Sequence, residues 1–239
     1  MTDPKHPCGL CRFKQDSLWQ PVEGASLSTL TRGFVRRDLA AGEVVFSQGT
    51  PSTGVYCVSR GLIALRAFAP DGRSHLLRLA YPGELIGYRA FLTGREHRTE
   101  AQALLPSRVC TVAARDAGQV IRATPAVMER LATRCADELD SYQDRLQAAA
   151  TRSNHDRLLA LLEQLMQAHG SEVDGAHQMR LPISRQDISD MLGIQPETLS
   201  RLLKRLADEG LVRSSGRRIT MPIRPDRFTQ VKKQRFAVG

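Results

Sequence analysis

The sequence lacks the features that mark secreted, membrane-spanning and disulfide-stabilised proteins. Five cysteines in 239 residues are too few for a disulfide scaffold, so we expect thiols, ligands or core residues. No run approaches the roughly 20 apolar residues of a membrane span. The first residues, MTDPKHPCGLC, contain no apolar signal core. We therefore expect a cytoplasmic protein with no membrane partner.

Positive charge, by contrast, is in excess. Lys and Arg number 34 against 25 Asp and Glu, a net charge of +9, which favours a polyanionic partner. Residues 171–239 hold 13 basic and 8 acidic side chains, a net +5, and the remaining 170 residues carry +4. With 41% apolar and 25% charged residues, the composition is that of a globular protein. Its length suggests one large or two small domains.

Residues 39–120 are predicted to form an antiparallel β unit. Short apolar runs such as AGEVVFSQG and VYCVSRGLIALRAFAPDGR are separated by turn signals at Pro70–Asp71–Gly72 and Pro82–Gly83. Apolar residues that alternate with polar ones are typical of strands with one buried face.

Helical periodicity replaces this pattern at Thr124, which is suited to cap a helix that Pro125 begins. Apolar residues then recur in steps of three and four to about residue 150. This narrow stripe is typical of a contact between two helices; a core helix is the alternative. The candidate dimer interface consists of Leu131, Cys135, Leu139, Tyr142 and Leu146. A second amphipathic helix is predicted at Asp156–His169, followed by a polar loop at residues 171–178.

The most specific pattern lies at residues 181–211. Ser184 and Asp187 form a capping-box-like helix start, and Gly193 supplies a turn. Pro196 then begins a second helix, which Gly210 ends. A short helix, a glycine turn and a second helix are the pattern of the helix–turn–helix. The alternative is a helical hairpin with a solvated charged face.

The outer face of that second helix predicts double-stranded DNA as the partner. Arg201 can pair with guanine, Glu197 can accept from a cytosine amino group, and Ser200 can contact either base edge. Further candidate DNA-binding residues are Ser184, Arg185, Thr198 and Lys204. A predicted hairpin around Ser215–Gly216, the wing, would place three arginines against phosphates: Arg213, Arg217 and Arg218. The tail Arg224–Arg235 adds more positive charge.

Taken together, these parts resemble the Crp/Fnr family of bacterial transcription regulators. The resemblance rests on the β unit with AGEVVFSQG, VYCVSRGLIAL and PGELIGY, on the long helix, and on PETLSRLLKRL. It implies an α+β fold with a cysteine-containing segment at residues 1–20 and a cyclic-nucleotide-binding-like β-roll (jelly roll) at 21–123. A long dimerisation helix at 124–150 and a winged helix–turn–helix at 151–239 would follow. The implied function is regulation of transcription by a homodimer that binds DNA and contacts RNA polymerase.

Within the family, the Glu-x-x-Ser-Arg pattern of Glu197, Ser200 and Arg201 is similar to the Fnr branch. That branch reads TTGAT-type half-sites in a palindrome. The cyclic-AMP branch usually has Gly where this chain has Ser200. The resemblance therefore implies a TTGAT-like site.

The resemblance also implies a signal. In oxygen-sensing Fnr proteins an N-terminal cysteine group and one distant cysteine hold a [4Fe–4S] cluster. An iron–sulfur site that responds to oxygen, redox state or nitric oxide is thereby implied at Cys8, Cys11 and Cys110. Ser17 stands where the remaining N-terminal cysteine is expected, so His6, Asp16 or another cysteine would complete the site. We expect Cys57 and Cys135 to be core thiols.

Other signals stay open for the same DNA-binding role. A cyclic nucleotide would use Gly83–Glu84 and Arg98–Thr99, but their separation is long for that pattern and Glu100 adds a carboxylate near the phosphate. Haem would use His6, His75 or His97. The Cys8–Cys11 pair could instead be oxidised as thiols or bind zinc. The rival class is a CxxC thiol oxidoreductase; no strand precedes the pair and no catalytic grouping is present, so we expect no enzyme.

Overall fold

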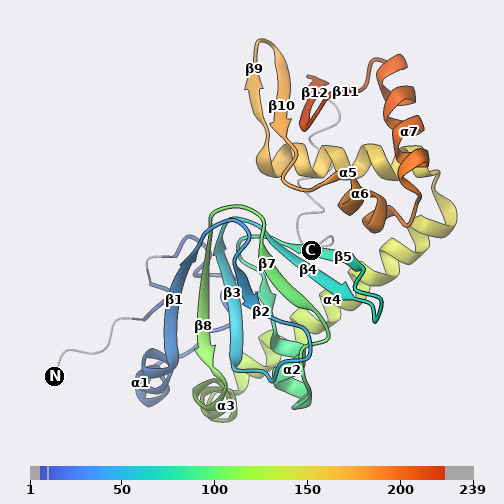
Figure 1. The fold of residues 1–239 in the computed structure, drawn as a ribbon. Helices are drawn as coiled ribbons and strands as arrows, with labels where there is room; N and C mark the ends of the chain where they lie inside the picture. Colours follow the sequence, from blue (N-terminus) through green and yellow to red (C-terminus); the bar gives the residue numbers. More distant parts are fainter. Residues whose placement is uncertain (1–5, 10, 224–239) are drawn as a thin grey trace. The chain divides into compact units, whose positions relative to one another are not determined.

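The computed structural model describes residues 6–9 and 11–223, and the chain forms two compact units with the boundary after Ala136 (Figure 1). Each unit combines helices and strands, which confirms the predicted α+β fold. The basic tail Arg224–Arg235 lies outside the described residues. No described helix is long and apolar enough to cross a membrane.

The first unit is built on two four-stranded antiparallel sheets, which confirms the predicted β-roll. Their strand orders are β1-β8-β3-β6 and β2-β7-β4-β5. The strands are β1 (Phe34–Leu39), β2 (Val44–Phe46), β3 (Gly54–Arg60), β4 (Ile63–Phe68), β5 (Ser74–Ala80), β6 (Leu85–Ile86), β7 (Glu100–Ala103) and β8 (Ser107–Ala113). Between the sheets lies an inner core that includes Val58, Ile63, Ala101 and Val109. Apolar residues alternate along the strands, and those that point inward fill the space between the sheets.

Three short helices interrupt or flank the strands: α1 (Gly24–Gly33), α2 (Tyr88–Thr93) and α3 (Ala114–Ala123). The prediction of an all-β region through residue 120 was therefore wrong at α2 and α3. In α3 the buried residues Ala117, Val120 and Ile121 follow helical spacing. α1 and α3 lie side by side (Figure 1), and a Cβ at Gly33 would overlap the side chain of Asp116. Gly33 thus permits this close helix contact.

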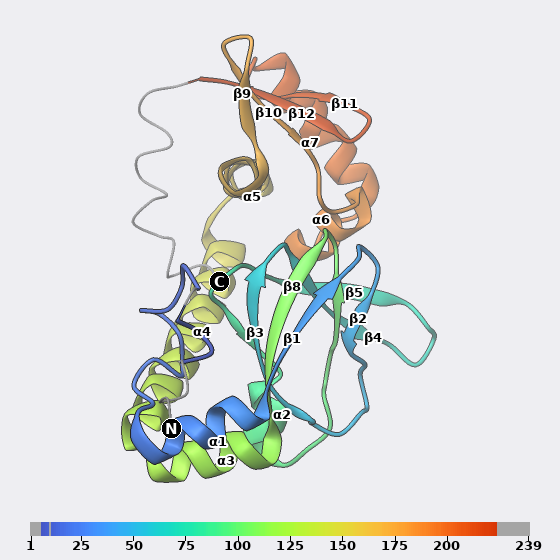
Figure 2. The same ribbon diagram turned by 90° about the vertical axis from the view of Figure 1, so that its left-hand side faces the viewer.

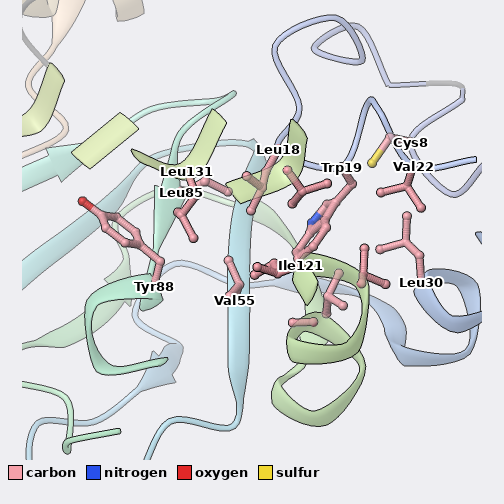
Figure 3. Close-up of a cluster of buried hydrophobic side chains, with 14 residues drawn as sticks. Cys8, Leu18, Trp19, Val22, Leu30, Val55, Leu85, Tyr88, Ile121 and Leu131 are labelled. Carbon is pink, nitrogen blue, oxygen red and sulfur yellow. The ribbon is translucent and has the colours of Figure 1, made fainter. Parts of the chain in front are cut away.

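A second core covers the outer face of sheet β1-β8-β3-β6. Val55 and Val112 from this sheet contact a group that includes Trp19, Leu30 and Leu131 (Figure 3). Besides α1, α2 and α3, two segments far apart in sequence contribute to this layer: the N-terminal segment and the beginning of α4 (Pro125–Thr151). The outer core therefore attaches both to the sheet.

The helix α4 extends for 27 residues, close to the predicted range, but its stripe divides in two. Leu131 is 0% exposed and Cys135 packs beside it in the outer core. Leu131 is therefore not available as a dimer contact, a correction to the predicted seam, whereas Cys135 is only partly buried. The periodicity could not distinguish the two uses of one stripe. Further along, Leu139 and Leu146 are 62% and 72% exposed.

Within its described residues the second unit contains the end of α4, three further helices and one four-stranded sheet, of order β11-β12-β10-β9. Its elements are α5 (Asn154–His169), β9 (Ser171–Val173), β10 (Ala176–Arg180), α6 (Arg185–Leu192), α7 (Pro196–Asp208), β11 (Arg213–Ser215) and β12 (Arg218–Pro222). The predicted loop at residues 171–178 is instead the hairpin β9–β10. Asp174 and Gly175 turn it with φ values of 50° and 71°, which a tight hairpin requires. Pairing with the distant β12 completes the sheet.

Two glycines with positive φ provide a test of the β-roll. Gly61 has φ +92°, and a Cβ there would lie 2.6 Å from Ser107 Cα; Gly72 has φ +82° and open space around it. We expect Gly72→Ala to cost about 1 kcal/mol of unfolding free energy through backbone strain. Gly61→Ala should cost about 1–3 kcal/mol more through overpacking. Urea unfolding followed by Trp19 fluorescence measures both; equal losses would contradict the packing at Gly61.

Candidate DNA interface and cysteine site

The helix–turn–helix is formed by α6 and α7, and its local signals act as predicted. Asp187 N donates to Ser184 Oγ (3.0 Å) and Ser184 N donates to Asp187 Oδ2 (2.8 Å), a capping box at the start of α6. Gly193 ends that helix with φ 64°, a conformation suited to glycine. Pro196 is at the start of α7. The Ser184 hydroxyl, a predicted DNA contact, is therefore engaged in the cap.

One face of α7 is buried and the other is exposed. Leu199, Leu203 and Leu206 are buried in the second unit. Of the five predicted DNA-binding residues on α7, Thr198 is half-buried and four are exposed: Glu197, Ser200, Arg201 and Lys204. The Ser200 hydroxyl donates to Pro196 O at 3.0 Å, which leaves its lone pairs as acceptors. α7 thus presents a polar and charged face near its N-terminus.

One arginine of the wing makes bonds that the sequence did not predict. The hairpin β11–β12 turns at Gly216, which has φ 58°. The Nε and Nη2 atoms of Arg217 donate to Leu181 O at 3.2 and 2.9 Å. Arg217 ties the wing to the residues before α6, an orientation that sequence could not reveal. Arg213 and Arg218 are exposed and remain candidate phosphate contacts.

The remaining predicted DNA contact, Arg185, lies exposed in the first turn of α6. Its Nη2 donates to Ser214 Oγ at 3.3 Å. A second bond therefore links the start of α6 to the wing, and the guanidinium keeps further donors for a ligand.

A cysteine-containing segment is attached to the first unit through its apolar residues. Cys11 N donates to Cys8 O at 2.9 Å, so the two cysteines belong to one tight turn. Leu18, Trp19 and Val22 are buried in the outer core, and Figure 3 shows the sulfur of Cys8 turned toward them. The segment is thus held against the sheet by the hydrophobic effect.

The other predicted ligand, Cys110, lies on the sheet under this segment. In the strand register Cys110 is paired with Arg36 on one side and with Cys57 on the other. Residues paired in this way point to the same face. Arg36 Nη2 donates to Pro7 O at 3.3 Å, and its guanidinium also contacts the sulfur of Cys110. Arg36 therefore joins the cysteine segment to strand β8.

Cys57 is a residue whose position sequence reasoning did not identify. It packs against the outer core as predicted for a core thiol. Its pairing with Cys110 depends on the register of β3 and β8, which joins residues more than fifty positions apart in the chain. Only the recurrence of cysteine in two predicted strands could have suggested it.

Burial and mutual repulsion control the acidity of these thiols. Burial raises the pKa of Cys8, Cys57 and Cys110, and the neighbouring cysteines raise it further. Arg36 acts in the opposite direction and lowers the pKa of Cys8 and Cys110. Thiols whose pKa values depend on each other lie near each other. The five cysteines, Cys11 included, are free thiols.

These thiols fit the donor chemistry of an iron–sulfur cluster, which cysteine thiolates hold. Within residues 6–9 and 11–223 no three His, Cys, Asp or Glu side chains converge as ligands of one metal ion. A cluster distributes its thiolates over several iron atoms, so its ligands stand farther apart than those of a single ion. The donor type is therefore that of an iron–sulfur cluster.

Two of the other predicted sensor residues, His6 and His97, already make contacts within the first unit. His6 Nε2 bonds to Trp19 O at 2.8 Å, and its Nδ1 accepts from Cys8 N at 3.1 Å. Asp16 is exposed. His97 is buried and stacks on Phe46 with ring centroids 3.9 Å apart; burial lowers the pKa of its imidazole. His75 lies in β5, on the sheet that does not carry Cys110.

The residues predicted for a cyclic nucleotide, Glu84 and Arg98, differ in their surroundings. Arg78 Nη1 donates to Glu84 Oε2 at 2.6 Å, so the acidic residue of the Gly83–Glu84 pair already has a cationic partner. Burial raises the pKa of Glu84, and Arg78 counters this. Arg98 is exposed. Glu84 is thus engaged with Arg78, while Arg98 lies on the surface.

Two arginines of α4 contact the cysteine segment, which lies beside the first part of this helix (Figure 2). Arg130 Nη1 donates to Gln15 O and Ser17 O at 2.9 and 3.1 Å. Arg134 donates to Asp16 O and, at 3.4 Å, to Gly83 O. The main chain beside the cysteine turn is therefore bonded directly to α4.

Each of the two units matches a known protein family. Residues 36–124 match the family described as cyclic nucleotide-binding domain, and residues 156–225 match the Crp-like helix-turn-helix domain. The chain is 30% identical over 217 residues to the nitrogen fixation regulation protein FixK of Bradyrhizobium diazoefficiens, covering 89% of each chain. It is 25% identical to the transcriptional activator protein FnrL of Cereibacter sphaeroides, over 89% of this chain and 86% of that one.

Solved structures share the fold. A CRP/FNR-family transcriptional regulator from Thermus thermophilus superposes with a TM-score of 0.69 at 24% identity, covering 86% of this chain and 99% of that one. FixK2 from Bradyrhizobium japonicum has a TM-score of 0.66 at 24% identity, over 84% and 96%. With the sequence relatives and the helix–turn–helix described above, the chain belongs to the Crp/Fnr family and is a DNA-binding transcription regulator.

Proposed function

We propose that this regulator binds a palindromic TTGAT-like site as a homodimer and responds to oxygen, redox state or nitric oxide through an iron–sulfur site. The observation that carries the sensor part is the position of the Cys8–Cys11 turn over the strand with Cys110. An iron–sulfur cluster bound there would supply iron and sulfide that react with oxygen and nitric oxide. The regulator would act in the cytoplasm with RNA polymerase as a further partner.

The DNA part of the proposal is supported by the exposed face of α7. Residues near the N-terminus of a recognition helix reach base edges in the major groove. Arg201 has the fork of donors that pairs with guanine, and Glu197 offers an acceptor to a cytosine amino group. A carboxylate on a surface that approaches phosphates is unfavourable unless it reads a base. Glu197 therefore supports sequence-specific reading.

The homodimer is supported by the two exposed leucines of α4. Leu139 and Leu146 are seven residues apart, so they lie on one stripe of the helix. Between them Tyr142 lies under the guanidinium of Arg145, 4.5 Å from its ring centroid. A second copy of α4 would cover this stripe, and two-fold symmetry would place two α7 helices on a palindrome.

Changing Arg201 tests how the protein reads DNA. Arg201→Ala should lower the preference for a TTGAT palindrome over a scrambled duplex by about 1–3 kcal/mol per half-site, because a bidentate guanine contact is lost. The control, Arg213→Ala, should weaken binding to both duplexes alike and reduce its salt dependence. Gel shifts at two salt concentrations measure both effects. Full preference in Arg201→Ala would reject the assigned contact.

Charge placed on the leucine stripe tests the dimer. The double variant Leu139→Glu, Leu146→Glu should be a monomer by light scattering, because burying unpaired carboxylates costs several kcal/mol. Asp137→Lys, on the opposite side of the helix by its periodicity, should remain a dimer. A dimeric double variant would move the interface to another surface.

Anaerobic purification tests the sensor. We expect a coloured protein that contains iron and sulfide and bleaches in air or with nitric oxide, with a parallel change in DNA binding. Cys110→Ala should lose the colour and Cys135→Ala should keep it. A colourless, iron-free wild type whose DNA binding is the same with and without air would overturn the proposal.

A further inference from the structure

The register of the outer sheet places a fourth thiol at the proposed cluster site. Cys57 in β3 lies directly opposite Cys110 in β8. Side chains at such positions share a face, with Cβ atoms about 4.5–5.5 Å apart. This face also carries the Cys8–Cys11 turn, because Cys11 and Cys57 both pack against the outer core that contains Cys8.

The residue that replaces the missing N-terminal cysteine has a different role. Ser17 is buried, its Oγ donates to Cys8 Sγ at 3.4 Å and accepts from Trp19 N at 3.2 Å. The hydroxyl therefore stabilises the segment around Cys8. A neutral hydroxyl is also a poor substitute for thiolate on iron–sulfur clusters. Ser17 holds the segment in place and leaves one ligand to be found.

Other candidates for this ligand are less suitable than Cys57. Both ring nitrogens of His6 are bonded, and Asp16 is exposed. Cys135 packs against the same core, but it lies in α4 and not on the sheet that carries Cys110. By contrast, Cys57 lies on the neighbouring strand, directly opposite Cys110. Cys57 is thus the thiol that belongs with the three proposed ligands.

We propose that Cys57 is the fourth thiolate ligand of the iron–sulfur site, in place of a cysteine at position 17. This inference rests on the proposed function of Cys8, Cys11 and Cys110. The site then takes two ligands from the terminal segment and two from neighbouring strands of one sheet. A cluster bound there would join the segment to the sheet. Without the cluster, the segment is held only by the outer core and by three arginines, Arg36, Arg130 and Arg134.

The test measures iron, sulfide and visible absorbance after anaerobic reconstitution of the full chain with ferrous iron and sulfide. Wild type should hold about four iron ions per chain, as one [4Fe–4S] cluster does. Cys57→Ala should lose at least one quarter of this iron and change its electron paramagnetic resonance spectrum. Cys135→Ala is the matched control and should keep the wild-type iron content.

A rescue variant separates ligation from folding. Adding Ser17→Cys to Cys57→Ala should restore the iron content, because position 17 then supplies the thiolate. If circular dichroism shows that Cys57→Ala is unfolded, Cys57→Ser is the replacement and should show the same loss of iron.

The outcomes distinguish the two proposals. A wild type that takes up no iron overturns the proposed function and this inference with it. A wild type with about four iron ions that Cys57→Ala matches in iron and spectrum overturns the role of Cys57 alone. Loss in Cys57→Ala with recovery in the double variant supports both. A Cys57–Cys110 disulfide in the anaerobic wild type would also overturn ligation by Cys57.

Discussion

The burial of the first turns of α4 in the outer core is the constraint on which the first unit of the molecule depends. Val127 and Leu131 are completely buried there, which fixes the helix against the sheet. Arg130 and Arg134 are thereby held within reach of the cysteine segment. A segment that shifts must lose these bonds or carry the helix with it. The same helix continues to Thr151 and carries the exposed leucines Leu139 and Leu146.

The DNA-binding unit depends on a similar kind of anchoring. Arg217 bonds the wing to the main chain before α6, and Arg185 bonds the first turn of α6 back to the wing. The wing also shares a sheet with β10. Recognition helix and wing are therefore presented together, and side chains on such a supported frame lose little entropy when they contact DNA.

A feature could be predicted from sequence when the residues that determine it lie close together along the chain. Ser184, Gly193 and Pro196 act within a few residues of themselves, so the helix–turn–helix could be placed from sequence. The pairing of Cys57 with Cys110 and of β10 with β12 depends on distant strands, and no local pattern contains that register. Leu131 and Leu139 share one apolar stripe, yet one packs inward and the other is exposed. The sequence does not distinguish Arg217 from the other wing arginines, because its partner, the carbonyl of Leu181, lies far from it along the chain.

The arginines of α4 bind carbonyl oxygens at Gln15, Asp16 and Ser17. Every amino acid carries a main-chain carbonyl, so this attachment does not depend on which side chains the segment bears. Side chains of the segment, the one at position 17 included, can therefore be exchanged without removing its bonds to the helix. The attachment to α4 thus persists whatever chemistry those side chains supply.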